Sequence, residues 1–145
     1  MATKWGKDDE KWLRELFRRH ARYFGQHPFK LEFLFRKTDE RDEDGITKMS
    51  VNRHYPYRTV DVCVYPEFWK QNQRSQRLDV FHEIIHLVLW EMGELRSGKL
   101  KAYQNAEENA IDTLALAYSK LYEENEKLKS QLRMIDGGEG KSGLQ

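Results

Sequence analysis

Two histidines and a glutamate, in the segment His82-Glu83-Ile84-Ile85-His86, have residue types and spacing that could do chemistry. Residues four apart on a helix lie on one face, so both imidazoles could bind one tetrahedral zinc ion. Glu83 lies about 100° around the helix from His82, where its carboxylate can reach a zinc-bound water without becoming a ligand. Zinc lowers the pKa of such a water to roughly 7, and the carboxylate can pass the proton to a leaving amine. The segment predicts hydrolysis at a zinc ion, with Glu83 as general base.

A zinc site of this kind needs a third protein ligand, for which the sequence offers a glutamate. No histidine follows His86, and an upstream histidine fits no established pattern. Glu107 and Glu108 stand at the start of the next predicted helix. Glu108 is followed one turn later by Asp112, whose carboxylate could accept a hydrogen bond from a ligating histidine. We therefore predict that Glu108 completes the zinc site of the two histidines and that Asp112 orients one of them.

Both parts of this pattern also have an interpretation without metal. The histidines could be satisfied side chains of a buried helix, and acidic residues are favoured at a helix N-terminus by the helix dipole. The intact combination of two histidines, glutamate and aspartate favours the metal site.

The sequence before the motif predicts a helix followed by a small sheet. Apolar residues recur at helical spacing from about residue 8 to residue 24. Three strands are then expected, at 29–36, 46–52 and 58–65, with a polar turn from 37 to 45. In the last strand valine occupies every second position, as in a strand with one buried face.

Two further helices complete the prediction. The motif helix is expected over 73–92, and its second half is apolar nearly all round, so it should be buried. A long helix carrying the glutamate should run from about 103 to 134. We therefore expect one α+β domain over 1–135, with a three-stranded sheet and these helices, and a flexible, glycine-rich tail over 136–145.

Composition restricts the classes of function. A net charge of +1 removes the bulk basicity expected of a nucleic-acid-binding protein. The single cysteine, Cys63, cannot form an intramolecular disulfide and fits a reducing compartment. No secretory signal and no membrane-spanning apolar run is visible. The expectation is a cytoplasmic protein that contacts neither membranes nor nucleic acid.

The last predicted helix carries leucine or isoleucine at every seventh position, namely at Leu114, Leu121, Leu128 and Ile135. This spacing would allow a short dimeric coiled coil through the C-terminal helix. The complementary positions three residues later are mixed. They favour a helix whose first part packs on the core and whose end projects, and a dimer stays a weaker alternative.

The motif followed by Glu108-x-x-x-Asp112 resembles the gluzincin branch of the zincin metallopeptidases, the thermolysin-like group, over roughly 58–118. The size and order of elements are similar to small phage or prophage zinc peptidases and to the catalytic part of the ImmA/IrrE family. The resemblance implies a minimal zincin-like fold, one Zn²⁺ ion and a zinc metalloendopeptidase acting on a protein or peptide. It also implies that the strand at 58–65 forms the sheet edge above the motif helix, where an extended substrate would add.

Two other functions stay open. A zincin-fold regulatory or protein-binding module, of the phage accessory type, could keep the zinc and act by association. A helical adaptor in which the motif is accidental would bind no metal. Glu83 distinguishes the peptidase from these two alternatives, because a purely structural zinc site does not need a general base.

Overall fold

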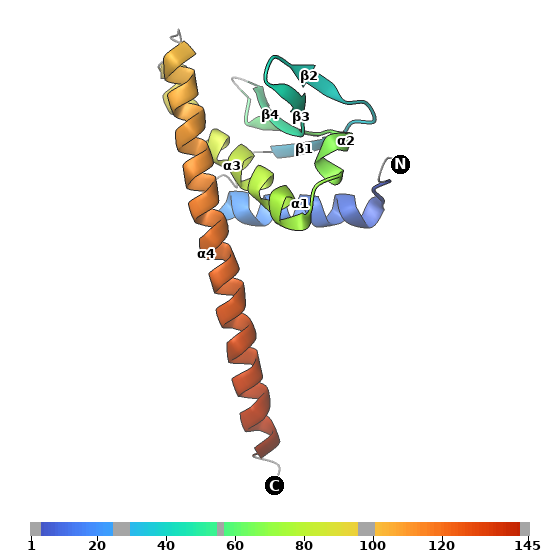
Figure 1. The fold of residues 1–145 in the computed structure, drawn as a ribbon, viewed down its shortest axis with the longest axis vertical. Helices are drawn as coiled ribbons and strands as arrows, with labels where there is room; N and C mark the ends of the chain where they lie inside the picture. Colours follow the sequence, from blue (N-terminus) through green and yellow to red (C-terminus); the bar gives the residue numbers. More distant parts are fainter. Residues whose placement is uncertain (1–3, 25–29, 55–56, 96–100, 143–145) are drawn as a thin grey trace.

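The computed structural model describes residues 4–24, 30–54, 57–95 and 101–142 and confirms the α+β class (Figure 1). Among the described residues, an N-terminal helix precedes the strands and three helices follow them, the last far longer than the rest of the domain is wide. In chain order the elements are α1 (Lys7–Tyr23), β1 (Lys30–Phe35), β2 (Glu40–Asp42), β3 (Gly45–Thr47), β4 (Met49–His54), β5 (Thr59–Val64), α2 (Pro66–Trp69), α3 (Gln73–Leu95) and α4 (Lys101–Ser142).

The main sheet has three strands in the order β1-β5-β4, with β5 parallel to β1 and antiparallel to β4. The prediction that the strand at 58–65 forms the sheet edge is therefore wrong, since β5 is central and β4 is an edge strand. Val60, Val62 and Val64 of β5 are fully buried, and Cys63 on its opposite face is also buried. Both faces of β5 are thus covered, and its two edges are paired with β1 and β4.

The predicted strand at 46–52 is two strands that separate at Lys48. Its first part, β3, forms a separate hairpin with β2, a strand that lies within the stretch predicted as a polar turn. Gly45 has φ of +134°, a backbone conformation that allows this turn and that side chains disfavour. The Tyr65 hydroxyl donates a hydrogen bond to Glu40, and the Tyr65 backbone N–H donates to the Lys48 carbonyl over 3.0 Å. The hairpin is thus fastened to the main sheet.

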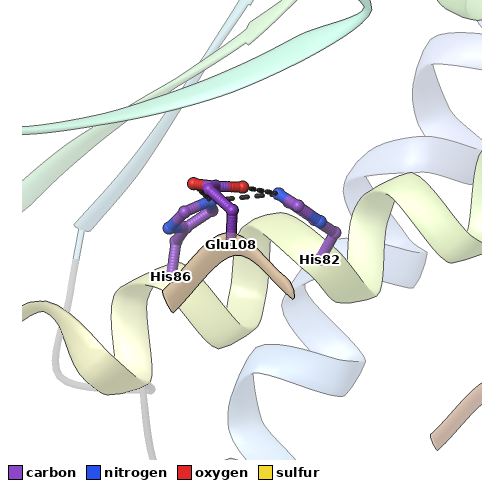
Figure 2. Close-up of side chains that lie close together, drawn as sticks. All are labelled: His82, His86 and Glu108. Carbon is purple, nitrogen blue, oxygen red and sulfur yellow. Dashed lines mark hydrogen bonds and ion pairs between the residues drawn. The ribbon is translucent and has the colours of Figure 1, made fainter. Parts of the chain in front are cut away.

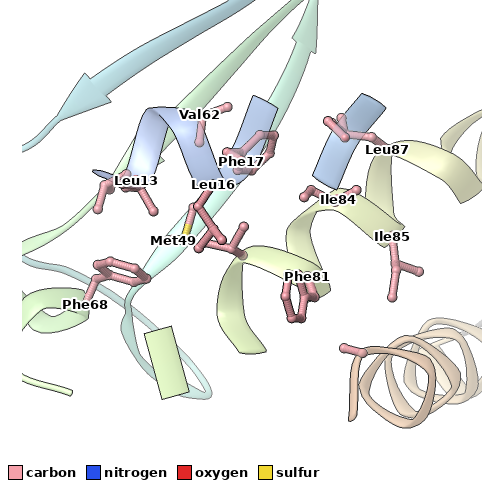
Figure 3. Packing of buried hydrophobic residues seen from close by; sticks show 14 of the residues in the cluster. Leu13, Leu16, Phe17, Met49, Val62, Phe68, Phe81, Ile84, Ile85 and Leu87 are labelled. Carbon is pink, nitrogen blue, oxygen red and sulfur yellow. The ribbon is translucent and has the colours of Figure 1, made fainter. Parts of the chain in front are cut away.

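The hydrophobic core lies between α1, the sheet and α3 (Figure 3). Phe17 of α1 and Val62 of β5 meet Phe81 and Ile84 of α3 in one buried cluster. Helix α3 is buried along one side, where Phe81, Ile84 and Leu87 enter the core, while Val88 on another side is 37% exposed. The prediction of a buried helix is thus confirmed for that side. This packing fixes the rotation of α3 about its axis, and hence the direction in which the motif residues point.

Helix α4 continues to Ser142, past the boundary at residue 135 where the predicted domain ended and a flexible tail was expected. Each further residue of an existing helix adds a backbone hydrogen bond, which offsets the cost of the glycines near its end. Within the described residues, no helix combines the length and the apolar character needed to cross a membrane.

His20 is a buried histidine that joins α1 to α4. Its side chain is 1% exposed, and its Nδ1 lies 2.7 Å from the Tyr118 hydroxyl. Its Nε2 has no hydrogen-bond partner among the described residues. Burial, with the nearby charge of Arg19, lowers the pKa of His20 to about 4. The folded protein therefore holds His20 neutral where an unfolded chain would protonate it.

Folding stability should fall as the pH drops from about 6.5 to about 4, through the His20 contribution. In this range the unfolded state binds a proton at His20 and the folded state does not, so acid favours unfolding by up to about 3 kcal/mol. A His20→Gln variant keeps a hydrogen-bonding group but does not titrate. Its unfolding free energy by urea denaturation should change less over this range than that of the wild type. Parallel curves for the two proteins would contradict the assignment.

Candidate metal centre

Helix α3 presents His82 and His86 on one face, one turn apart (Figure 2). Phe81, Ile84 and Ile85 of the same segment are buried in the core and hold this face away from it. The two imidazole Nε2 atoms lie 3.0 Å apart, and both histidines are partly exposed. Their metal-binding nitrogens therefore converge on one point at the helix surface.

Helix α4 brings Glu108 to the same point. Its Oε1 lies 3.1 Å from His86 Nε2, and its Oε2 lies 3.3 Å from His82 Nε2. The carboxylate thus faces both rings. The structure therefore places Glu108 beside both histidines. The sequence analysis preferred Glu108 to its neighbour Glu107 because Asp112 follows it by one helical turn.

The three side chains form a group that could hold a metal ion, with ligand atoms within 4.8 Å of one another. Ligands of a tetrahedral ion with bonds of about 2.0–2.1 Å are about 3.3 Å apart. The two Nε2 atoms are 3.0 Å apart, and each lies near a different oxygen of Glu108, at 3.1 Å for His86 and 3.3 Å for His82, so these separations are close to this value. Two imidazoles and one carboxylate are also a donor set of borderline softness, suited to zinc and neighbouring transition metals.

Asp112 fixes the orientation of one ligand. Its Oδ1 lies 2.7 Å from His82 Nδ1, on the side of the ring opposite Nε2. An N–H at Nδ1 donates to the carboxylate, so the lone pair of Nε2 points at the metal position. The predicted role of Asp112 is thus matched by its geometry.

The neutral form of His86, which its surroundings favour, is the form suited to metal binding. Burial lowers the pKa of His86, although the negative charge of Glu108 opposes this. A neutral imidazole is the form that binds a metal ion, so the ring does not have to lose a proton first.

Glu83 lies beside the metal group in a cavity of about 390 Å³ that is also lined by His82 and Asp112. Burial, together with the negative charges of Glu108 and Asp79, raises the pKa of Glu83 to about 8. A hydrogen bond from the Val51 backbone in β4 opposes the shift. Glu83 is therefore a carboxyl group whose neutral and charged forms are close in energy near neutral pH.

The cavity contains residues that the sequence analysis missed. Asp79, one helical turn before Glu83, accepts a hydrogen bond from Gln71 over 2.6 Å, and burial raises the pKa of Asp79. The β2–β3 hairpin adds Asp42 and Lys48. The spacing of Asp79 and Glu83 could have indicated a shared helix face, but nothing in the sequence placed the hairpin over α3.

Replacing Glu108 by Gln should remove most of the bound zinc, while Glu107→Gln should leave it. The two residues are neighbours with the same charge, but the Glu108 carboxylate lies within 3.3 Å of both histidines. Zinc per chain is measured by elemental mass spectrometry after dialysis. Equal zinc contents of the two variants would exclude Glu108 as a ligand.

Asp112→Asn should raise the dissociation constant for zinc by about 10- to 100-fold, the usual effect of losing the carboxylate behind a ligating histidine. Asp44→Asn is the matched control, because Asp44 lines the same cavity. The Asp44→Asn variant loses the same negative charge as Asp112→Asn, but among the described contacts Asp44 has none with His82. Competition with a fluorescent zinc chelator measures both. A similar loss in the two variants would mean that cavity charge, and not histidine orientation, is responsible.

Comparison with known proteins gives no assignment for this centre. No family model, no curated protein and no solved structure matches the chain. The likeness to gluzincins therefore stays a prediction from the motif residues, and any function has to follow from the chemistry of the centre.

Proposed function

We propose that this protein is a zinc-dependent metalloendopeptidase whose general base is Glu83. The observation that carries the proposal is the place of Glu83. Glu83 lines the same cavity as the candidate ligand His82 but is not part of the group of three that could hold the ion. A site that used metal only for stability would need the two histidines and Glu108, and would have no use for a buried carboxyl group beside them.

A zinc ion held by His82, His86 and Glu108 would supply Lewis-acid polarisation and a water of lowered pKa. The residues of the chain supply the rest. Glu83, with a pKa near 8, can accept a proton from the attacking water and donate it to the leaving amine. The negative charges of Asp79 and Glu108 support the protonated form of Glu83, and the Val51 hydrogen bond supports its carboxylate.

The substrate would lie along β4, and not along β5 as the sequence analysis expected. Strand β4 is an edge of the main sheet, and the backbone of Val51 in this strand reaches Glu83. Met49, at the start of β4, lines the cavity together with His82. An extended peptide that adds to this edge by backbone hydrogen bonds would pass the metal group and the general base.

The alternative is a regulatory or protein-binding module that binds zinc without catalysis. Both functions predict the same metal content. They differ in whether Glu83 is needed, so the deciding variant changes this residue and leaves the ligands in place.

Glu83→Gln should keep one zinc per chain and lose peptidase activity by about 10²- to 10⁴-fold, the contribution of a positioned general base. Amide and carboxylic acid have the same shape, so the helix and the ligands should be preserved. Activity is measured as the appearance of new peptide termini, by mass spectrometry, in a proteome-derived peptide mixture.

Three controls accompany this test. Asp44→Asn, in the same cavity, should retain activity. Chelation should abolish cleavage and added zinc should restore it, which excludes a contaminating protease that does not use zinc. A wild-type protein with one zinc and no cleavage of any peptide would reject the enzyme and favour the binding module.

A further inference from the structure

Helix α4 has 42 residues, and only its first part is covered by the rest of the domain. Ile111 and Ala115 are buried in the core, and Tyr118 meets His20. The guanidinium of Arg19 in α1 lies 3.7 Å from Glu126. Beyond this ion pair the helix extends away from the other elements (Figure 1), and the described side chains from 130 to 136 are all exposed.

An exposed apolar stripe begins on α4 beside the domain and continues into the projecting part. Leu121 is 64% exposed, Leu128 58% and Ile135 55%, and they follow one another at seven-residue spacing. Leu132, 59% exposed, lies between the last two. If the seven-residue series occupies the d positions of a heptad, the a positions lie four residues after each member. Within the exposed stretch these a positions are Asn125 and Leu132. They replace the positions three residues after each member, which the sequence analysis took as the complementary ones.

This stripe points away from the domain. Counted at about 100° per residue, the stripe of Leu121 and Leu128 lies roughly a third of a turn around the helix from the face that contains Ile111 and Ala115. Leu114, on the continuation of the stripe at the level of the domain, is 51% exposed. A second helix could therefore lie along the stripe without displacing the contacts of α4 with its own domain.

The charges beside the stripe complement those of a second copy in parallel orientation. In a parallel pair, each g residue faces the e residue five positions later in the partner helix. Here Glu124 occupies g and Lys129 occupies e, so each would face the opposite charge, twice in a symmetric dimer. Lys129 is half-exposed and lies 3.5 Å from Glu126 of its own helix, which leaves it at the surface beside the stripe.

Asn125 adds a second argument for the same arrangement. A single asparagine at an a position specifies a parallel, in-register pair, because its amide finds a hydrogen-bonding partner only in the same residue of the other chain. Asn125 is exposed in the single chain. Since the domain already holds the first part of α4 as a helix, the dimer would not have to nucleate it.

We propose that residues 121–135 of α4 form a parallel, two-stranded coiled coil with a second copy of this chain. The inference does not depend on zinc or on peptidase activity.

Sedimentation velocity over a concentration series tests the dimer on the full chain. The wild type should change from monomer to dimer as concentration rises. Leu128→Glu should raise the dimer dissociation constant by roughly a hundredfold, because it places a charge in the seam twice per dimer. Met134→Glu is the matched control, since Met134 is 76% exposed on another face of the same helix, and it should change the constant by less than about threefold.

A charge exchange tests orientation and register. Glu124→Lys and Lys129→Glu should each weaken the homodimer, since like charges then face each other. Mixing these two variants should restore a dimer, because opposite charges meet again at both positions. Circular dichroism confirms that each variant keeps its helix content.

A monomer at every concentration would overturn the proposal, and so would an oligomer larger than a dimer. Equal effects of Leu128→Glu and Met134→Glu, or no restoration on mixing, would overturn the seam or its register.

Discussion

Glu108 and Asp112 reach the histidines because Ile111 and Ala115, on the neighbouring stripe of α4, are packed into the core. Ile111 is fully buried and Ala115 almost so, while Glu108 and Asp112 are exposed side chains that could otherwise point into water. A shift of α4 by one turn along α3 would carry the glutamate about 5.4 Å past the imidazoles. The apolar contact between α3 and α4 thus sets the metal geometry, and the polar residues follow from it.

That packing assembles charges that repel each other. Glu83, Asp79, Glu108 and Asp112 approach one another around two histidines. Burial is the main cause of the raised pKa values of Glu83 and Asp79, and the neighbouring carboxylates add to it. A divalent cation at the histidines would lower the cost of this repulsion, because its charge lies next to Glu108 and near the others. The same centre is therefore least stable without metal and best adapted to hold one. Without metal, the apolar packing between α1, the sheet and α3 has to offset the free-energy cost of bringing these carboxyl groups together.

The sequence predicted the residues of the centre better than it predicted the sheet around them. Helical spacing is a local property, so His82, His86 and the pair Glu108 and Asp112 could be placed from the sequence. Strand order depends on contacts between distant segments, and alternating valines cannot distinguish a central strand from an edge strand that has one covered face. The break at Lys48 left no local signal, since β3 and β4 together read as one alternating strand.

The length of α4 links the two ends of the molecule. Its first half needs only to reach Tyr122 to complete the core and the metal group, yet the helix continues for many turns with an apolar stripe on a separate face. A continuous helix transmits position along its axis, because each turn is hydrogen-bonded to the next. In a dimer that holds Leu128 and Leu132, the two copies of α4 would be restrained by each other as well as by their own domains. An interaction made equally well in two states shifts neither of them. Because the stripe lies on a face separate from the contact with α3, the projecting ends can pair, and Glu108 can dock on the histidines, each without the other.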